Sequence, residues 1–149
     1  MISKILVPSD GSKASQKAAA YAVDLAKQLK ASVVVLSVID QRSFMAQTVP
    51  AAKTARHIIE PIEDYLREAA EVYAGEIKKL CDESGVALET SIKTGHPVEE
   101  IIKQAKKSKA NLIVMGSHGR SALSATVLGS VSYGVIHENS SVPVLIVKG

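Results

Sequence analysis

The sequence is poor in aromatic residues and has a single cysteine and no tryptophan. Phe, Trp and Tyr make up 3% of its 149 residues, which is too sparse for a platform that stacks nucleic-acid bases. Cys81 alone cannot form an internal disulfide, so we expect a reducing, cytoplasmic setting and a packing role for this residue. No apolar run approaches the roughly 20 residues of a membrane span, and the run Ile2–Val7 is too short for a signal peptide. We therefore expect neither a membrane nor a nucleic-acid partner.

Several familiar phosphate-binding fingerprints are also missing. The P-loop pattern Gly-x-x-x-x-Gly-Lys-Ser/Thr does not occur. The first expected strand is followed by Pro8-Ser9-Asp10-Gly11-Ser12, not by the Gly-x-Gly-x-x-Gly of dinucleotide-binding folds. That segment also lacks the Ser-Gly-Gly-x-Asp-Ser loop with which ATP pyrophosphatases bind their released pyrophosphate. These absences weigh against a P-loop NTPase, a dehydrogenase and an ATP-using transferase.

The net charge of +3 is mild, although four lysines gather near the end of one expected helix. These are Lys103, Lys106, Lys107 and Lys109. Cations are favoured near a helix C-terminus by the helix dipole, and the apolar residues of this helix would lie on its opposite side. The lysines therefore indicate a solvated helix face, not a nucleic-acid patch.

Apolar runs and helical periods alternate along the whole chain. We expect strands at residues 2–7, 32–38, 86–92, 111–115 and 142–147. Helices are expected from a cap at Ser12 through Lys30, at 61–84 with Pro61 in its first turn, at 98–108 and at 130–139. This order predicts one α/β domain, 1–149, with an open five-stranded parallel sheet and helices on both faces. The connection 40–60 is either a lid, with Phe44 and Met45 as its apolar contacts, or a surface loop.

A glycine-rich segment follows the fourth expected strand. The run Gly116-Ser117-His118-Gly119 begins where the apolar residues end, and Gly129-Ser130 comes after nine further residues. Glycine allows backbone N–H groups to converge on anionic oxygens and permits positive φ. A helix that begins near Ser130 adds its N-terminal N–H groups and the positive end of its dipole. The alternative is a purely structural role, in which these glycines only turn the chain and cap a helix.

Met115 followed by Gly-x-x-Gly, nine residues and Gly-Ser resembles the ATP-binding branch of the universal stress protein family. The resemblance extends to Val7-Pro8-Ser9-Asp10, to Val38-Ile39-Asp40 and to the closing run 142–147. It implies a Rossmann-like sheet of the adenine nucleotide alpha hydrolase type, with strand order 3-2-1-4-5. Ligands in such sheets bind at the carboxyl ends of the strands beside the switch point, which here means after the first and fourth strands.

The resemblance implies a set of ATP-binding residues around this edge. Asp10 would accept hydrogen bonds from ribose hydroxyls or help to hold a metal, and capping the next helix is its alternative role. Backbone N–H groups of the glycine-rich segment would bind the phosphates, with Mg²⁺ held through phosphate oxygens and water. We assign no catalytic residue and no protein metal ligand. The binding set comprises Pro8, Ser9, Asp10, Val38, Met115, Gly116, His118, Gly119, Arg120, Gly129, Ser130, Val131 and Ser132.

The expected function is that of a nucleotide-dependent regulatory or sensor module in a stress response. Hydrolysis or self-phosphorylation would at most be slow, because the sequence offers no P-loop lysine, acidic pair or obvious base beside the phosphates. The alternative is a nucleotide-free module that acts through dimerisation and protein partners of unknown identity. Pro143 places the last strand at a sheet edge, yet Val142–Val147 is apolar on both faces. We therefore expect this strand to pair with a second copy, and the resemblance implies the same homodimer.

Overall fold

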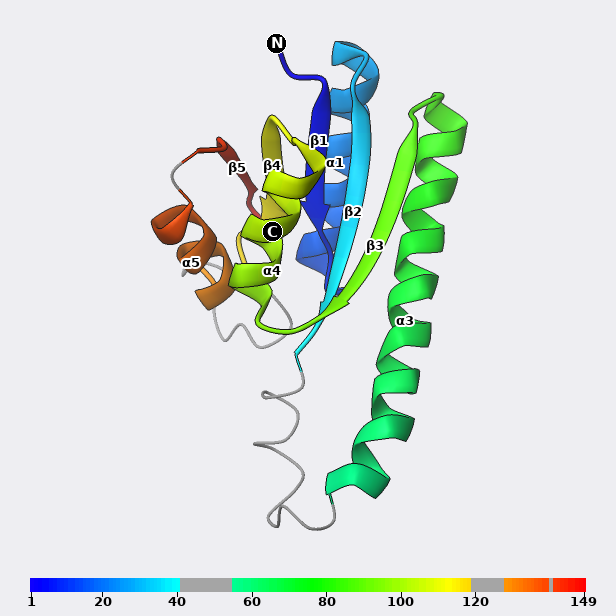
Figure 1. The fold of residues 1–149 in the computed structure, drawn as a ribbon. Coiled ribbons are helices and arrows are strands. Elements are labelled where there is room, and N and C mark those ends of the chain that lie inside the picture. The colour runs from blue at the N-terminus through cyan, green and yellow to red at the C-terminus, as the bar shows by residue number, and fades with distance from the viewer. Residues whose placement is uncertain (41–54, 119–127, 140) are drawn as a thin grey trace.

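The computed structural model describes residues 1–40, 55–118, 128–139 and 141–149. Within these residues, strands and helices alternate as the sequence predicts (Figure 1). The elements are β1 (Lys4–Pro8), α1 (Lys13–Leu29), β2 (Ser32–Ile39), α3 (Ala55–Ser84), β3 (Leu88–Thr94), α4 (Pro97–Ser108), β4 (Leu112–Gly116), α5 (Ser130–Glu138) and β5 (Val144–Val147).

The strands form one five-stranded sheet in the order β3-β2-β1-β4-β5, and every pair is parallel. This confirms the expected architecture and strand order. β1 is the central strand, with Pro8 opposite Leu36 of β2 and Leu6 opposite Ile113 of β4. Because all strands run the same way, their carboxyl ends share one edge, at the bottom of the sheet in Figure 1. The order reverses between β1 and β4, which makes their ends the switch point.

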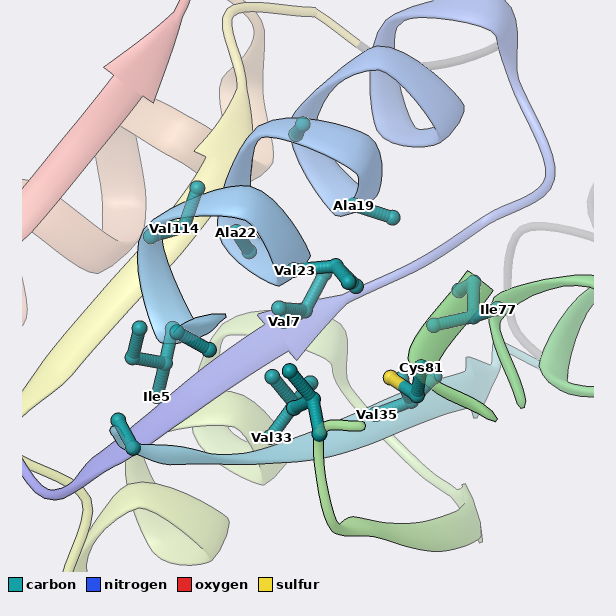
Figure 2. Packing of buried hydrophobic residues seen from close by; sticks show 14 of the residues in the cluster. Ile5, Val7, Ala19, Ala22, Val23, Val33, Val35, Ile77, Cys81 and Val114 are labelled. Carbon is teal, nitrogen blue, oxygen red and sulfur yellow. The ribbon is translucent and has the colours of Figure 1, made fainter. Parts of the chain in front are cut away.

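Helices cover both faces of the sheet. α1 and α3 pack on one face through a cluster built around Ile5, Val7, Val33 and Val35, while α4 and α5 pack on the other. Small residues allow α1 to lie close to the sheet, since Ala18, Ala22 and Ala26 are fully buried. Figure 2 shows Ile77 and Cys81 of α3 reaching into the same cluster beside Val35.

Cys81 is a core residue, as expected from the sequence. Its side chain is 0% exposed. Burial, followed by the neighbouring Asp82 carboxylate, raises the pKa of the Cys81 thiol. The thiol therefore stays protonated and poorly nucleophilic at neutral pH.

Two expectations about prolines were wrong. α3 begins at Ala55, so Pro61 lies in its second turn and not in its first. β5 begins at Val144, so Pro143 precedes the strand, although β5 does lie at the sheet edge. The carbonyl of Pro143 still accepts from the Ile113 N–H at 2.9 Å, but proline has no N–H with which to continue the ladder. The start of a helix is likewise poorly specified by a local pattern. β3 is also displaced by two residues at each end relative to the expected strand 86–92.

The expected lid falls mostly on residues 41–54, outside the described residues, so its two alternatives stay predictions. Among the helices described, none combines the length and the apolar character that crossing a bilayer requires.

Candidate functional site

The segment after β1 and the end of β4 lie together at the carboxyl edge. A Cβ added to Gly116 would lie 2.9 Å from the carbonyl carbon of Ala14 and 3.0 Å from its Cβ. Ala14 belongs to the first turn of α1, directly after the Asp10–Ser12 turn. The two motifs found in the sequence therefore meet across the switch point, as expected.

Gly116 is required here for its size and not for its backbone conformation. The glycines with positive φ among the described residues are Gly11, Gly85 and Gly95. Gly116 instead lets the backbone of α1 approach β4 more closely than any side chain would allow. Of the two properties of glycine that the sequence suggested for this segment, close approach and positive φ, Gly116 shows only the first.

Asp10 lies exposed at the turn between β1 and α1. Its Oδ1 accepts a hydrogen bond from the backbone N–H of Ser12 at 2.9 Å. The helix cap itself is Ser12, whose Oγ accepts from the N–H of Ser15 at 3.1 Å. Asp10 thus shapes the turn but does not cap α1, and a carboxylate has capacity for about four hydrogen bonds. The geometry suits a carboxylate that also accepts from a ligand.

The start of α5 presents a helix N-terminus on the β4 side of the same edge. Gly129 is the N-cap, with φ −63° and ψ 158°. The N–H of Tyr133 donates to the Gly129 carbonyl at 2.9 Å, which begins the helical pattern. The N–H groups of Ser130, Val131 and Ser132 precede that bond and have no intrahelical acceptor. Together with the helix dipole they form a site suited to an anion.

Two groups expected to bind phosphate are instead used to attach α5 to the end of β4. The N–H of Gly129 donates to the Ser117 carbonyl at 2.6 Å. The Ser132 hydroxyl, in a side chain only 3% exposed, donates to the Gly116 carbonyl at 2.7 Å. Buried polar groups need such partners. Of the groups expected to bind phosphate in this helix, the N–H groups of residues 130–132 and the exposed Ser130 hydroxyl remain as candidates.

The family resemblance also implies an apolar slot for adenine, formed by Pro8 and Val38 and closed by Met115, and these residues differ in burial. Met115 is 5% exposed and packs in the core below α4 and α5. Val38 is half-buried and packs against the same cluster, and Pro8 is half-buried at the end of β1. Ser9 is buried, with its N–H donating to the Leu36 carbonyl at 2.8 Å. Met115 is thus chiefly a core residue, while Pro8 and Val38 border the edge.

His118 lies toward β5. Its Nδ1 is 3.1 Å from the Ser117 Oγ, and a Cβ on Gly149 would lie 2.7 Å from its Cε1. The Ser117 N–H also donates to the Val147 carbonyl at 3.1 Å. The start of the glycine-rich segment is therefore fastened to the last strand. Gly119 and Arg120 lie outside the described residues, and their phosphate contacts stay predictions.

The sequence reasoning missed a contact on the other side of the Asp10 turn. Gly11 has φ +77°, and the ring of Tyr73 from α3 occupies the space where a Cβ on Gly11 would lie. An Asp-Gly pair after a strand is a recognisable turn signal. The partner of this glycine, far along the chain, has no signal in the sequence.

Two further features concern metal ligands and a hollow in the surface. In the ranges that the structure describes, no three His, Cys, Asp or Glu side chains gather as metal ligands. A hollow of about 390 Å³ lies at the opposite, amino edge and is lined in part by Lys27, Lys30 and Gly85. It contains none of the candidate residues and borders the C-terminal ends of α1 and α3.

The model of the universal stress protein family matches residues 1–148. The chain belongs to this family. The universal stress protein MJ0531 of Methanocaldococcus jannaschii is 39% identical over 145 residues, which cover 97% of this universal stress protein and 81% of that one. The solved structure of MJ0577 from the same organism is 33% identical with a TM-score of 0.81, over 100% of this chain and 97% of that chain.

A universal stress protein solved in complex with cAMP is a more distant neighbour. It is 24% identical with a TM-score of 0.66, and the match covers 98% of this chain and 96% of that chain. A likeness at this level of identity shows that the two proteins share a fold.

Proposed function

We propose that this universal stress protein binds ATP at the carboxyl edge between β1 and β4 and serves as a nucleotide-dependent regulatory module in a cytoplasmic stress response. One observation carries the proposal: the packing of Gly116 on Ala14 brings the Asp10 turn beside the end of β4. α5 is tied to that end by the bond from Ser132 to Gly116. A carboxylate and a helix N-terminus therefore flank one switch point.

The groups at this edge fit the parts of an adenine nucleotide. The Asp10 carboxylate suits ribose hydroxyls, which are hydrogen-bond donors. The N–H groups of residues 130–132 and the Ser130 hydroxyl suit phosphate oxygens. The half-buried Pro8 and Val38 offer apolar surface for the base. The neighbour solved with cAMP adds that an adenine nucleotide is compatible with the fold.

The site is better suited to holding ATP than to hydrolysing it quickly. Fast phosphoryl transfer needs a group that orients the nucleophile and charges that act mainly on the transition state. His118 is engaged with Ser117 and lies against Gly149. Mg²⁺ would enter with the phosphates. Any turnover should stay below about one per second, the low end of ordinary enzyme rates.

The test uses a proline at the first position of α5. Ser130→Pro removes one N–H and one hydroxyl, while proline is well tolerated at this helix position. The preceding Gly129 already has the extended ψ of 158° that a residue before proline prefers. Ser130→Ala is the matched control, because it removes the hydroxyl and keeps the N–H.

Affinities for ATP and for adenosine are measured by calorimetry, with thermal unfolding alongside. Losing a hydrogen bond to a charged group costs about 1.5–3 kcal/mol. We therefore expect Ser130→Ala, which loses one such bond, to bind ATP about 10- to 150-fold more weakly than the parent. Ser130→Pro loses two and should bind ATP more weakly still. Adenosine affinity should be unchanged, since adenosine has no phosphate. A parent that binds no ATP, and releases none on denaturation, would refute the proposal.

A second candidate is a nucleotide-free module that acts through a homodimer. β5 forms one edge of the sheet, and each of its four residues is half-buried although all are apolar. On the neighbouring α5, Tyr133 and Ile136 are exposed. Pairing of β5 with a second copy would cover this surface. A parent that is dimeric but binds no nucleotide would favour this function.

A further inference from the structure

We propose that Tyr73 is a positioning residue of the nucleotide site: its ring, packed on Gly11, holds the Asp10 turn so that the carboxylate meets the ribose. This inference rests on the proposed function and adds a residue of α3, an element that carries no other part of the site. Tyr73 would act through the turn without touching the nucleotide.

The contact is close and leaves room only for glycine. A Cβ on Gly11 would lie 2.0 Å from Cε2, 2.1 Å from Cζ and 2.6 Å from Cδ2 of Tyr73. The ring therefore lies directly against the Gly11 Cα, on the side where another residue would carry its side chain. The φ of +77° is a second, independent reason for glycine at this position.

The rest of the turn is held by hydrogen bonds to β2, to α1 and within the turn itself. The Ser9 N–H donates to the Leu36 carbonyl at 2.8 Å, and Asp10 Oδ1 accepts from the Ser12 N–H at 2.9 Å. Gln16 Nε2 donates to the Gly11 carbonyl at 3.2 Å. None of these bonds involves α3. The Tyr73 ring adds a contact from α3, across the turn.

Tyr73 is itself well anchored. Neighbouring turns of α3 bury Ala70, Ala74 and Ile77, which are 6%, 8% and 5% exposed. Ile77 packs in the cluster under the sheet, as Figure 2 shows. In Figure 1 the first half of α3 extends past the carboxyl edge. Tyr73 belongs to the second half of α3, together with Ala74 and Ile77. This part of α3 is fixed in the core and contacts the turn through the Tyr73 ring.

This arrangement predicts a selective defect. Without the ring, the turn can shift and the Asp10 carboxylate is no longer preorganised for the ribose hydroxyls. The N–H groups at the start of α5 are unaffected, because they belong to another element. Removal of Tyr73 should therefore weaken recognition of the ribose and leave recognition of the phosphates intact.

The experiment compares ATP with 2′,3′-dideoxy-ATP, which lacks both ribose hydroxyls. Affinities are measured by calorimetry for the parent, Tyr73→Ala, Tyr73→Phe and Tyr65→Ala. Tyr65 is the matched control, since it lies on the same helix and is 70% exposed. We expect Tyr73→Ala to bind ATP at least fivefold more weakly and to bind dideoxy-ATP as the parent does. Tyr73→Phe retains the ring and should restore ATP binding, and Tyr65→Ala should match the parent.

A second variant approaches the same contact from the turn. Gly11→Ala introduces a Cβ that neither the Tyr73 ring nor the φ of +77° accommodates, so it displaces the turn and should give the same selective loss even if Tyr73→Ala folds poorly. Equal losses for both nucleotides, or no loss for ATP, would overturn the positioning role while leaving the proposed function standing. A parent that binds neither nucleotide would overturn both.

Discussion

Gly116→Ala tests whether the edge is built on the close approach of α1 to β4. The added Cβ would lie 2.9 Å from the Ala14 carbonyl carbon and 3.0 Å from both its oxygen and its Cβ. Carbon atoms in good contact are about 3.5–4.0 Å apart, so α1 must retreat by roughly half an ångström or more. Two of the three clashing atoms belong to the backbone, and no change of side-chain rotamer relieves them. Overpacking of this kind costs about 1–3 kcal/mol.

The assay is thermal unfolding followed by circular dichroism. For a chain of this size, each kcal/mol lowers Tm by roughly 2–4 °C, so Gly116→Ala should unfold about 2–12 °C below the parent. Gly75→Ala is the matched control. Gly75 is exposed within α3 and a Cβ there meets nothing within 4 Å. Alanine at that position should stabilise the helix by about 0.5–1 kcal/mol.

An unchanged or higher Tm for Gly116→Ala, with the expected gain for Gly75→Ala, would refute the close-approach argument. The result also bears on the nucleotide site. A variant of Gly116 that loses ATP binding would not distinguish a lost phosphate contact from a displaced α1. Ser130→Pro avoids this ambiguity because it leaves that packing intact.

Two further predictions concern the core thiol and the sheet edge. Burial raises the Cys81 pKa above its ordinary value of 9.0, so above that pH the unfolded chain loses its thiol proton first and stability falls as pH rises. Cys81→Ala should show a shallower decline in urea stability between about pH 8 and 10, and an equal decline would contradict the burial argument. Replacing Leu145 or Val147 with Asp should convert the proposed dimer into monomers or aggregates in sizing experiments. A dimer that persists would place its interface away from β5.

The alternation of strands and helices was readable from the sequence because buried strands and amphipathic helices leave different periods. Strand order could not be predicted from the hydrophobic pattern, because that pattern does not specify which strands pair. The prediction of strand order came from the family resemblance. The ends of elements were the least predictable. α3 continues six residues before Pro61, although proline removes one helical hydrogen bond.

The location of the candidate site could be predicted from the sequence, but most of its contacts could not. Parallel strands bring the ends of β1 and β4 to one edge, so Asp10 and Gly116 had to lie near each other. The use of the Gly129 N–H and the Ser132 hydroxyl depends on how α5 docks on β4. The Tyr73 contact depends on the position of α3. No local sequence motif specifies how α5 packs on β4 or where α3 lies.

Asn111 fastens the two halves of the chain at the end of the sheet opposite the site. Its Oδ1 accepts from the N–H of Ser3 at 2.8 Å, and from the Ser3 hydroxyl and the Lys4 N–H at 2.9 Å each. Asn111 and Ser3 are 108 residues apart in sequence. Closing so large a loop is entropically costly, and contacts of such long range slow folding.

Until β4 joins β1 during folding, the central strand has one open edge, and Asp10 and the start of α5 are not yet held at one edge of the sheet. Under the proposed function, a nucleotide that spans this junction would bind only the completed fold. By mass action it would stabilise the pairing of β4 with β1, and folding of the chain from β4 onward would depend on ligand concentration.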